Sequence, residues 1–458
     1  MKNKKFKLLI VLLALCSGLA NAQATSPNST AMQWWKDGKF GLFLHWGLYS
    51  QTAGYWKGQK ARANEHFMLG EKIPLKEYAT IANDFNPVKF NAEEWVKSAK
   101  NAGMKYIVIT AKHHDGFSMY DSPSQPYNIV KTSPWGKDPM KDLAVACKKY
   151  NLKLCFYYSL GRDWQDPDVP TRDGYRSNTW DYPNEEMKDF AKYFERKVKP
   201  QIRELLTQYG PIGLLWFDTP EQISKAQSTA LREMIKSIQP NCIINDRIGN
   251  GMGDYSVAEQ KIEDKTVIKP WEACVTMSAK WGYVKYDTVW KSPELLVRQL
   301  VEVVCKGGNF LLNVAPKGDG NFPAEATDRL KALGNWMRIN HDAIYGVSPF
   351  KILNEGAQSE VGRADAMGKS DNDFTSKNTR PDAYFAKKGK VIYAYARSWK
   401  MKQLNLKSLT KAIASIKSVS MLGSGEKIKW VQSSQGLNIE LPNKLPSGLP
   451  VYVFEIGI

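Results

Sequence analysis

The feature that most constrains the fold of this 458-residue chain is a regular alternation of short apolar runs and longer amphipathic segments between residues 39 and 341. One run, at 212–218, follows a Tyr-Gly-Pro turn and is apolar at successive positions, which is typical of a strand buried on both faces. Strands that alternate with helices predict a parallel sheet covered by helices. We predict strands at 39–44, 105–110, 152–158, 212–218, 242–245 and 309–314, and helices at 91–102, 139–150, 185–209, 225–238, 293–306 and 324–341.

Polar and aromatic side chains stand at the carboxyl ends of several of these strands. His45 follows the first strand, His113 and His114 follow the second, Tyr157 ends the third and Asp218 ends the fourth. An open doubly wound sheet gathers its ligands at one switch point, whereas the strand ends of a closed barrel share one rim. The sequence therefore predicts an α/β fold with a (β/α)8-like TIM barrel, and a functional site at its carboxyl rim.

A second domain is predicted after residue 346, where helical patterns give way to short β-rich runs separated by turns. Such runs predict an antiparallel β-sandwich. The chain length suits a barrel of about 250–350 residues followed by one smaller domain. We therefore divide the chain into a catalytic barrel at 23–346 and a C-terminal β-sandwich at 347–458, with strands at 391–396, 414–421, 427–431, 437–441 and 451–456 and a polar surface loop at 354–378.

Residues 1–22 have the pattern of a signal peptide. Lysines open the segment, an apolar run follows, and Ala20-Asn21-Ala22 supplies a small-x-small cleavage site. Cys16 raises the alternative of a lipoprotein, but Leu15 stands where a small residue would be required. The run is too short to cross a membrane, and no other stretch is long and apolar enough. We expect cleavage after Ala22, no membrane insertion, and a periplasmic or secreted protein.

The net charge narrows the possible binding partners of the protein. The formal net charge of +18 is compatible with binding to nucleic acid or to acidic glycans. The lysines are scattered and no aromatic-basic motif is present, so we expect no nucleic-acid partner. The sequence indicates no particular oligomeric state.

Of the six cysteines, five follow residue 22, an odd number without a CxxC pair. This pattern favours buried free thiols over a disulfide framework.

The strand-end residues allow more than one role. Asp218 precedes Thr-Pro, so it could cap the following segment or act chemically at the rim. His113, His114 and Asp115 could bind a metal ion, but adjacent side chains on an extended segment are expected to diverge, and no further ligands stand at a recognisable spacing. We therefore predict no metal and no cofactor. Histidine and tyrosine that bind hydroxyl groups, beside aromatic rings that cover C–H faces, favour a sugar ligand.

Hydrolysis of a glycosidic bond requires two carboxyl groups, which lie about 5–5.5 Å apart in retaining enzymes. Asp218 supplies one of them. Trp216, two residues earlier and on the same side of the strand, is placed to exclude water from it. The second carboxyl group stays open among Glu65 in the first long loop, Glu259 in a Gly-rich loop region, and Glu272 after Pro-Trp.

Seven motifs are highly specific in combination. They are KFGLFLHWGLYS at 39–50, GMKYIVITAKHHDGF at 103–117, FYYS at 156–159, GLLWFD at 213–218, NDR at 245–247, WGY at 281–283 and GGNFLLNVAPKGDG at 307–320. Through these motifs the chain resembles the α-L-fucosidases of glycoside hydrolase family 29 over most of residues 34–346. The resemblance implies an exo-acting retaining enzyme that releases terminal α-L-fucose from fucosylated glycans through a covalent fucosyl-enzyme, without a metal. The alternatives are a retaining glycosidase for another deoxy or galacto-configured sugar, and a fucose-binding module without catalysis.

The resemblance also implies roles by position. Asp218 matches the nucleophile, and Trp281 matches an aromatic residue near the sugar methyl group. His66 stands where the family often has tryptophan. The proton donor varies within the family; Glu259 fits its placement best, and Glu272 is the alternative. The residues expected around the fucose are His45, Glu65, His66, His113, His114, Tyr157, Trp216, Arg247 and Trp281.

Overall fold

The computed structural model describes residues 29–170, 176–356, 383–397, 402–446 and 450–458. Eight parallel strands form one sheet: β1 (Phe40–Leu44), β4 (Tyr106–Lys112), β5 (Lys153–Ser159), β6 (Leu214–Asp218), β7 (Ile243–Ile244), β8 (Ser256–Glu259), β9 (Trp271–Thr276) and β10 (Asn309–Val314). Their order is β7-β6-β5-β4-β1-β10-β9-β8. A parallel bridge between Asn245, after β7, and Tyr255, before β8, joins the two outer strands, so the sheet closes into a barrel. The predicted barrel is confirmed.

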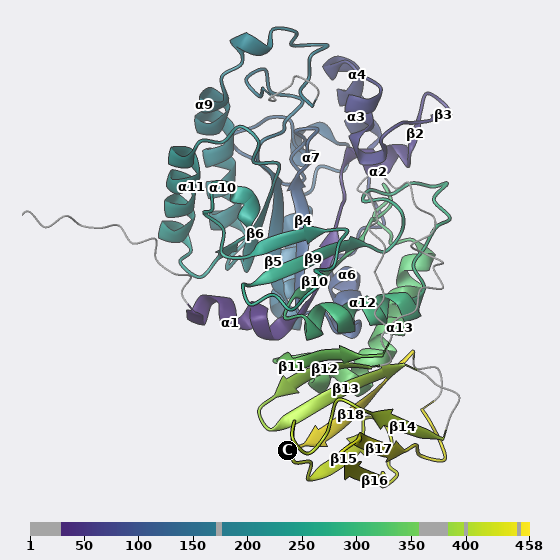
Figure 1. Ribbon diagram of the computed structural model, residues 1–458. Coiled ribbons are helices and arrows are strands. Elements are labelled where there is room, and N and C mark those ends of the chain that lie inside the picture. The colour runs from purple at the N-terminus through teal and green to yellow at the C-terminus, as the bar shows by residue number, and fades with distance from the viewer. Residues whose placement is uncertain (1–28, 171–175, 357–382, 398–401, 447–449) are drawn as a thin grey trace, which may run out of the picture.

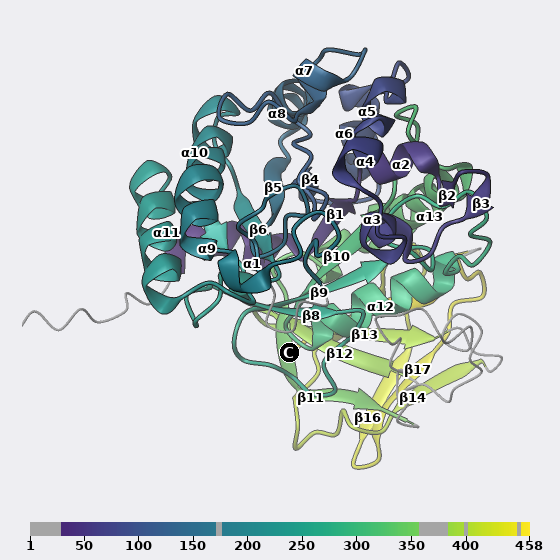
Figure 2. The ribbon, with the colours of Figure 1, turned by 90° about the horizontal axis from the view of Figure 1, so that it is seen from above.

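Helices surround this barrel, as Figures 1 and 2 show. A two-stranded hairpin, β2 (Tyr55–Trp56) with β3 (Gln59–Lys60), and several short helices follow β1. The α-helices are α1 (Ser29–Gly38), α2 (Leu48–Thr52), α3 (Phe67–Gly70), α4 (Leu75–Ala79), α5 (Ile81–Asp84), α6 (Ala92–Asn101), α7 (Ile129–Thr132), α8 (Pro139–Tyr150), α9 (Phe190–Tyr193), α10 (Lys199–Gln208), α11 (Lys225–Ile238), α12 (Pro293–Cys305) and α13 (Ala324–Asn340). The shorter 3-10 and π segments are η1 (Asn64–His66), η2 (Glu185–Met187), η3 (Phe194–Val198), η4 (Asp246–Ile248) and η5 (His341–Ala343).

Helix α8 shows how local sequence sets the ends of an element. The Asp138 side chain accepts a hydrogen bond from the Met140 N–H, and Pro139 occupies the first turn, where no N–H donor is needed. Asn151 ends the helix with a left-handed φ of 58°. The helices predicted at 139–150 and 225–238 are confirmed.

The single long helix predicted at 185–209 is wrong. The segment consists of η2, α9, the π segment η3 and α10. Asp189 begins a new helix because its side chain accepts a hydrogen bond from the Ala191 N–H. Pro200 lacks the N–H that a continuous α-helix requires, which explains the wider π turn immediately before α10.

Strand β8 was not predicted. It has four residues, is only partly buried, and ends on a charged side chain, so it lacks an apolar run. The described chain also has no α-helix between β7 and β9, so the strand–helix alternation fails there. The prediction that placed Glu259 in a Gly-rich loop is therefore wrong, because Glu259 is the last residue of β8.

The C-terminal part forms two antiparallel sheets. One contains β11 (Ser348–Glu355), β12 (Ala383–Lys388), β13 (Val391–Arg397), β18 (Val451–Gly457) and β15 (Ser418–Met421), and the other contains β14 (Gln403–Leu406), β17 (Gly436–Glu440) and β16 (Trp430–Ser433). Apolar side chains of both sheets share one core, so the predicted β-sandwich is confirmed. The strands predicted at 414–421 and 427–431 begin later than expected, and β11, β12 and β14 were not predicted.

The sandwich packs against the barrel through α12 and α13, at the end remote from α2–α4 (Figure 1). Trp336 on α13 donates a hydrogen bond to the Val451 carbonyl at 2.9 Å, and the Tyr395 hydroxyl donates to the Ala343 carbonyl. Tyr393 and Tyr395 belong to the barrel's own apolar core. The second domain therefore supports the barrel without covering the loops that follow its strands.

Some sequence predictions fall on residues outside the described ranges. These are the signal peptide at 1–22, including Cys16, and most of the loop at 354–378. Within the described ranges, no helix has the length and apolar character needed to span a membrane. The cysteines there are free and buried, as predicted: Cys147, Cys155, Cys242, Cys274 and Cys305.

Candidate active site

The carboxyl rim of the barrel brings most of the predicted site residues together. Parallel strands end at the same edge, so Asp218 at the end of β6 and Glu259 at the end of β8 face one space. The loop after β1 adds the 3-10 helix η1. Hydrogen bonds, ion pairs and ring contacts connect His45, Glu65, His66, His113, His114, Tyr157, Trp216, Asp218, Arg247, Glu259 and Trp281 into one site.

Asp218 accepts hydrogen bonds on both carboxylate oxygens. Oδ2 accepts from the Tyr157 hydroxyl at 2.8 Å, and Oδ1 accepts from Arg247 Nη1 at 2.6 Å and from the Thr219 N–H at 2.9 Å. Burial raises the pKa of Asp218, but the charge of Arg247 and these hydrogen bonds outweigh it, so the net pKa is lowered. Asp218 is therefore ionised at neutral pH. The next helix, α11, is capped by Ser224, so Asp218 is not its cap.

The backbone beyond Asp218 adopts an unusual conformation. Thr219 has a left-handed φ of 54°, which is costly for a β-branched residue. Gly161 makes room for this turn, because a Cβ atom at that position would lie 1.9 Å from the Thr219 carbonyl oxygen. The Leu160 N–H donates to the Asp218 carbonyl at 3.0 Å. The strand end that carries the carboxylate is thus fixed by its neighbour β5.

Arg247 lies between two carboxylates. Its Nη1 binds Asp218, and its Nη2 donates to Glu259 Oε2 at 2.6 Å. The guanidinium carbon lies 4.9 Å from the ring centroid of Trp216. The Glu259 side chain is 32% exposed and that of Asp218 is 14% exposed. One cation therefore holds a recessed carboxylate beside a more open one, an arrangement suited to a nucleophile and a proton donor.

The tautomer of His45 follows from its partner. Asn313 donates its Nδ2 hydrogen to the Trp281 carbonyl at 2.8 Å, so its Oδ1 faces His45 Nδ1 at 2.7 Å and accepts the proton there. Nε2 of His45 is left with a lone pair. Burial lowers the pKa of His45 to about 4, so the ring is neutral at pH 7. His45 is therefore an acceptor for a ligand hydroxyl group.

The tautomer of His114 also follows from its hydrogen-bond partner. The Ser159 hydroxyl donates to the Arg162 carbonyl at 2.7 Å, so Ser159 Oγ accepts the Nδ1 proton of His114 at 2.5 Å. The lone pair is then on Nε2, which lies 3.6 Å from Asp218 Oδ2. Burial lowers the pKa of His114 well below its usual value. Sequence reasoning missed the orienting roles of Ser159 and Asn313, although Ser159 ends the FYYS motif.

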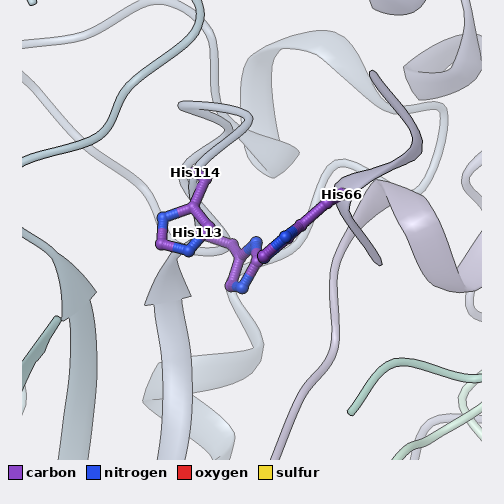
Figure 3. Close-up of side chains that lie close together, drawn as sticks. All are labelled: His66, His113 and His114. Atoms are coloured by element: carbon purple, nitrogen blue, oxygen red, sulfur yellow. The ribbon is translucent and has the colours of Figure 1, made fainter. Parts of the chain in front are cut away.

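His66, His113 and His114 converge at the rim, as Figure 3 shows. The ring centroids of His113 and His114 lie 4.2 Å apart, and one nitrogen of each of the three rings lies within 4.8 Å of the others. The expectation that the adjacent side chains of His113 and His114 diverge is therefore wrong, and His66, from a distant part of the sequence, joins them. The pairing register shifts between Thr110 and Lys112, so the regular alternation of side chains is lost before the two histidines.

Aromatic rings form the inner wall of the site. The ring centroid of Phe43 lies 4.5 Å from that of His45, 5.0 Å from that of Trp216 and 6.0 Å from that of Trp281. Tyr157 stacks on Trp216 with centroids 5.5 Å apart and an interplanar angle of 21°. Sequence reasoning did not single out Phe43. Its spacing of two residues from His45 was the available signal, because residues i and i+2 of a strand share one face.

Glu65 fixes the loop that carries Trp281. It is buried in η1, and its Oε2 accepts the Gly282 N–H at 3.2 Å. Burial raises the pKa of Glu65. Together with the Asn313 contact to the Trp281 carbonyl, this bond holds the 281–282 segment against the site.

Glu272 lies away from the rim, near the N-terminal end of β9 inside the barrel. Its Oε2 accepts the Tyr106 hydroxyl at 2.7 Å, and its Oε1 accepts Trp216 Nε1 at 3.0 Å. Burial raises its pKa to about 7. The side chain is fully enclosed, so the geometry does not support Glu272 as a proton donor to substrate. Glu272 is instead part of a strand that is buried along its whole length.

We expect Glu272→Gln to remove a pH dependence of stability. Burial raises the pKa of Glu272 from 4.5 to about 7, so the folded state retains a proton that the unfolded state releases in this window. The free energy of unfolding should therefore fall as the pH rises, by up to about 3 kcal/mol, and this fall should be absent from the Gln variant. Urea unfolding of the parent protein and of Glu272→Gln at pH 4.5 and pH 7.5 measures this fall in the free energy of unfolding. An equal fall in both proteins would contradict the assignment of the raised pKa to Glu272.

A pair of carboxylates, neutral histidines and aromatic rings at the carboxyl rim of a barrel define the site of a glycoside hydrolase. The family model for α-L-fucosidase matches residues 17–342, and the model for the α-L-fucosidase C-terminal domain matches residues 372–456. The tissue α-L-fucosidase of Mus musculus is 29% identical over 446 residues, covering 91% of this chain and 89% of that protein. The α-L-fucosidase of Dictyostelium discoideum is 30% identical over 379 residues, covering 76% and 80%. The chain belongs to the α-L-fucosidase family.

Solved structures agree with this assignment. The α-L-fucosidase from Vibrio sp. strain EJY3 has a TM-score of 0.82 and 29% identity, covering 95% of this chain and 74% of that one. Isoenzyme 1 from Paenibacillus thiaminolyticus has a TM-score of 0.79 and 31% identity, covering 93% and 98%. AlfC from Lactobacillus casei, in complex with its α-L-fucose product, has a TM-score of 0.63 and 38% identity, covering 67% and 97%. The predicted enzyme class is therefore confirmed.

Proposed function

We propose that this α-L-fucosidase acts by retention, releasing terminal α-L-fucose from fucosylated glycans, with Asp218 as nucleophile and Glu259 as acid/base. The observation that carries the proposal is the pair of ion pairs from Arg247, one to each carboxylate. They hold two carboxyl groups next to each other at the rim, as double displacement requires.

The reaction then follows two steps. Ionised Asp218 attacks the anomeric carbon, the bond to the leaving oxygen breaks, and Glu259 gives its proton to that oxygen. The products are a fucosyl ester of Asp218 and ionised Glu259. Water then attacks the anomeric carbon, the bond from that carbon to Asp218 breaks and returns the ionised carboxylate, and Glu259 takes a proton from the water. Fucose leaves with the anomeric configuration of the substrate.

Arg247 supports the movement of charge between the two carboxyl groups. Before the first step it pairs with ionised Asp218, while Glu259 carries the proton. Once Asp218 is esterified and neutral, the ion pair of Arg247 with Glu259 stabilises the ionised base. The negative charge changes place, and the same guanidinium compensates it in both steps.

The side chains around the carboxylates suit a deoxy sugar. The lone pairs on Nε2 of His45 and His114 accept hydrogen bonds from sugar hydroxyl groups. Trp281, whose ring centroid lies 5.0 Å from that of His45, offers an apolar face for the methyl group of fucose. The Tyr157 hydroxyl donates a hydrogen bond to Asp218 and so orients the nucleophile.

Proton NMR during hydrolysis of 4-nitrophenyl α-L-fucoside tests the mechanism. The α-anomer of fucose should form first, and first formation of the β-anomer would overturn retention. Oligosaccharides with α1,2, α1,3, α1,4 and α1,6 fucose then define the preferred linkage. Binding of fucose without hydrolysis would instead indicate a sugar-binding module, and preferential cleavage of a galactoside would indicate another sugar.

Hydrolysis should not depend on a metal ion. The proposed mechanism uses only Asp218, Glu259 and Arg247 to move charge and protons, so no step needs a Lewis acid. Dialysis against EDTA should leave kcat on the aryl fucoside unchanged. A loss of activity that added zinc restores would contradict this prediction.

We also propose that the protein is exported and that the mature chain begins at Gln23. The basis is the signal-peptide pattern and the cleavage site at Ala20-Asn21-Ala22. Intact-mass measurement of protein recovered outside the cytoplasm should give the mass of residues 23–458. A retained leader, or a lipid on Cys16, would contradict the prediction.

A further inference from the structure

The geometry points to a binding site for a divalent transition-metal ion, formed by His66, His113 and His114, at which zinc inhibits the enzyme. This site shares His114 with the proposed sugar site, but its ligands are imidazoles rather than the carboxylates that carry out the proposed hydrolysis. Its nitrogens come from two segments, the η1 helix after β1 and the end of β4. Among the described residues, this is the group of histidine, cysteine and carboxylate side chains whose ligand atoms converge closely enough to share one ion.

The ligand nitrogens have nearly the spacing that zinc needs. They lie within 4.8 Å of one another, whereas a tetrahedral ion with Zn–N bonds of about 2.0–2.1 Å places its ligand nitrogens roughly 3.4 Å apart. The rings therefore need to approach by at most about 1.4 Å. His66 is half-buried on a short 3-10 helix, so a change in its side-chain torsions can supply this movement, while His113 and His114 are buried.

The hydrogen bonds of the histidine rings also suit a metal ion. His114 donates from Nδ1 to Ser159, which leaves the Nε2 lone pair directed away from that bond. Nδ1 of His113 is buried and has no hydrogen-bond partner within the described structure. Three imidazoles that can each direct one nitrogen toward a common point match the ligand set of a three-histidine zinc site.

The position of the ion explains why it would inhibit. His114 Nε2 lies 3.6 Å from Asp218 Oδ2, so an ion on that nitrogen lies beside the carboxylate that must attack the sugar. The carboxylate and the cation attract each other, which makes Asp218 less nucleophilic and occupies the space of the sugar. Zinc should therefore slow hydrolysis reversibly.

Isothermal titration of the purified enzyme with zinc chloride, followed by anomalous diffraction from zinc-soaked crystals, tests the site. We expect one ion per chain at the three histidines. His66→Gln should weaken binding on the order of 100-fold or more, because it removes a direct ligand. His341→Gln is the matched control, since His341 is an exposed histidine that pairs with Asp342. It should bind zinc like the parent protein.

Circular dichroism confirms that each variant is folded, and the titration does not depend on turnover. The inhibition constant of zinc on the aryl fucoside should equal its dissociation constant and should rise by the same factor in His66→Gln. The site is refuted if the parent protein binds no zinc, if His66→Gln binds it with unchanged affinity, or if the anomalous peak lies elsewhere. Failure of the fucosidase mechanism would leave the binding result unaffected.

Discussion

Replacement of Asp218 by alanine is expected to lower kcat on aryl and natural fucosides by on the order of 10⁴-fold or more, because the variant cannot form the covalent intermediate. The hydrogen bonds to the Asp218 carboxylate show why this residue suits the role of nucleophile. Tyr157, Arg247 and the Thr219 N–H all donate to this one carboxylate and keep it ionised. Stopped-time assays with 4-nitrophenyl α-L-fucoside measure the loss.

Two controls show whether Asp218→Ala loses activity because the nucleophile is missing or because the protein is unfolded. Asp319→Ala removes a carboxylate from the loop after β10, where it binds Lys89, and should retain nearly full activity. Azide added to Asp218→Ala should restore turnover and give the fucosyl azide of inverted configuration, since azide attacks from the side that Asp218 vacates. Near-normal activity of a folded Asp218→Ala protein would remove the residue from the mechanism.

Replacement of Glu259 by alanine is expected to lower kcat/KM on natural fucosides by roughly 10²–10⁴-fold, and on activated aryl fucosides far less. A proton donor matters most when the leaving group is poor, and nitrophenolate leaves without protonation. The alkaline limb of the pH profile should flatten for the same reason. Parallel assays on 4-nitrophenyl α-L-fucoside and a fucosylated disaccharide, over a range of pH, measure both effects.

The structure supplies two contrasts for this experiment. Glu263→Ala removes a nearby carboxylate that pairs with Lys261 rather than with Arg247, so it should leave both substrates unaffected. Glu272→Ala should lower the stability, because it leaves the hydroxyl of Tyr106 and the indole of Trp216 without their buried acceptor. Whatever enzyme remains folded should treat both substrates alike. A leaving-group dependence in Glu272→Ala and not in Glu259→Ala would reverse the assignment.

Local sequence signals predicted the elements that have strong patterns. α8, α11 and β10 lie at the positions expected from caps, helical periodicity and a continuous apolar run. The same signals failed where two of them conflicted. In 185–209 the helical periodicity is continuous, but Asp189 and Pro200 interrupt the backbone hydrogen bonding, and the interruption prevailed.

The strand ends account for most of the candidate site. Asp218, His45 and Tyr157 could be placed at one rim from the sequence, because parallel strands of a barrel end together. The position of Glu259 could not be derived in this way. Its strand β8 is short and partly exposed, so it has neither an apolar run nor a flanking helix to mark it.

The sequence by itself thus determined the barrel, the sandwich and the identity of most residues at the rim, because local periodicity shows which segments are buried strands and which are amphipathic helices. Only the tertiary structure decided how those residues act together. His45 takes its tautomer from Asn313, 268 residues away, and Arg247 joins carboxylates from two strands. The convergence of His66 on His113 depends on side-chain directions at a β-irregularity. Such directions depend on packing between segments that are distant in the chain, and no local pattern records them.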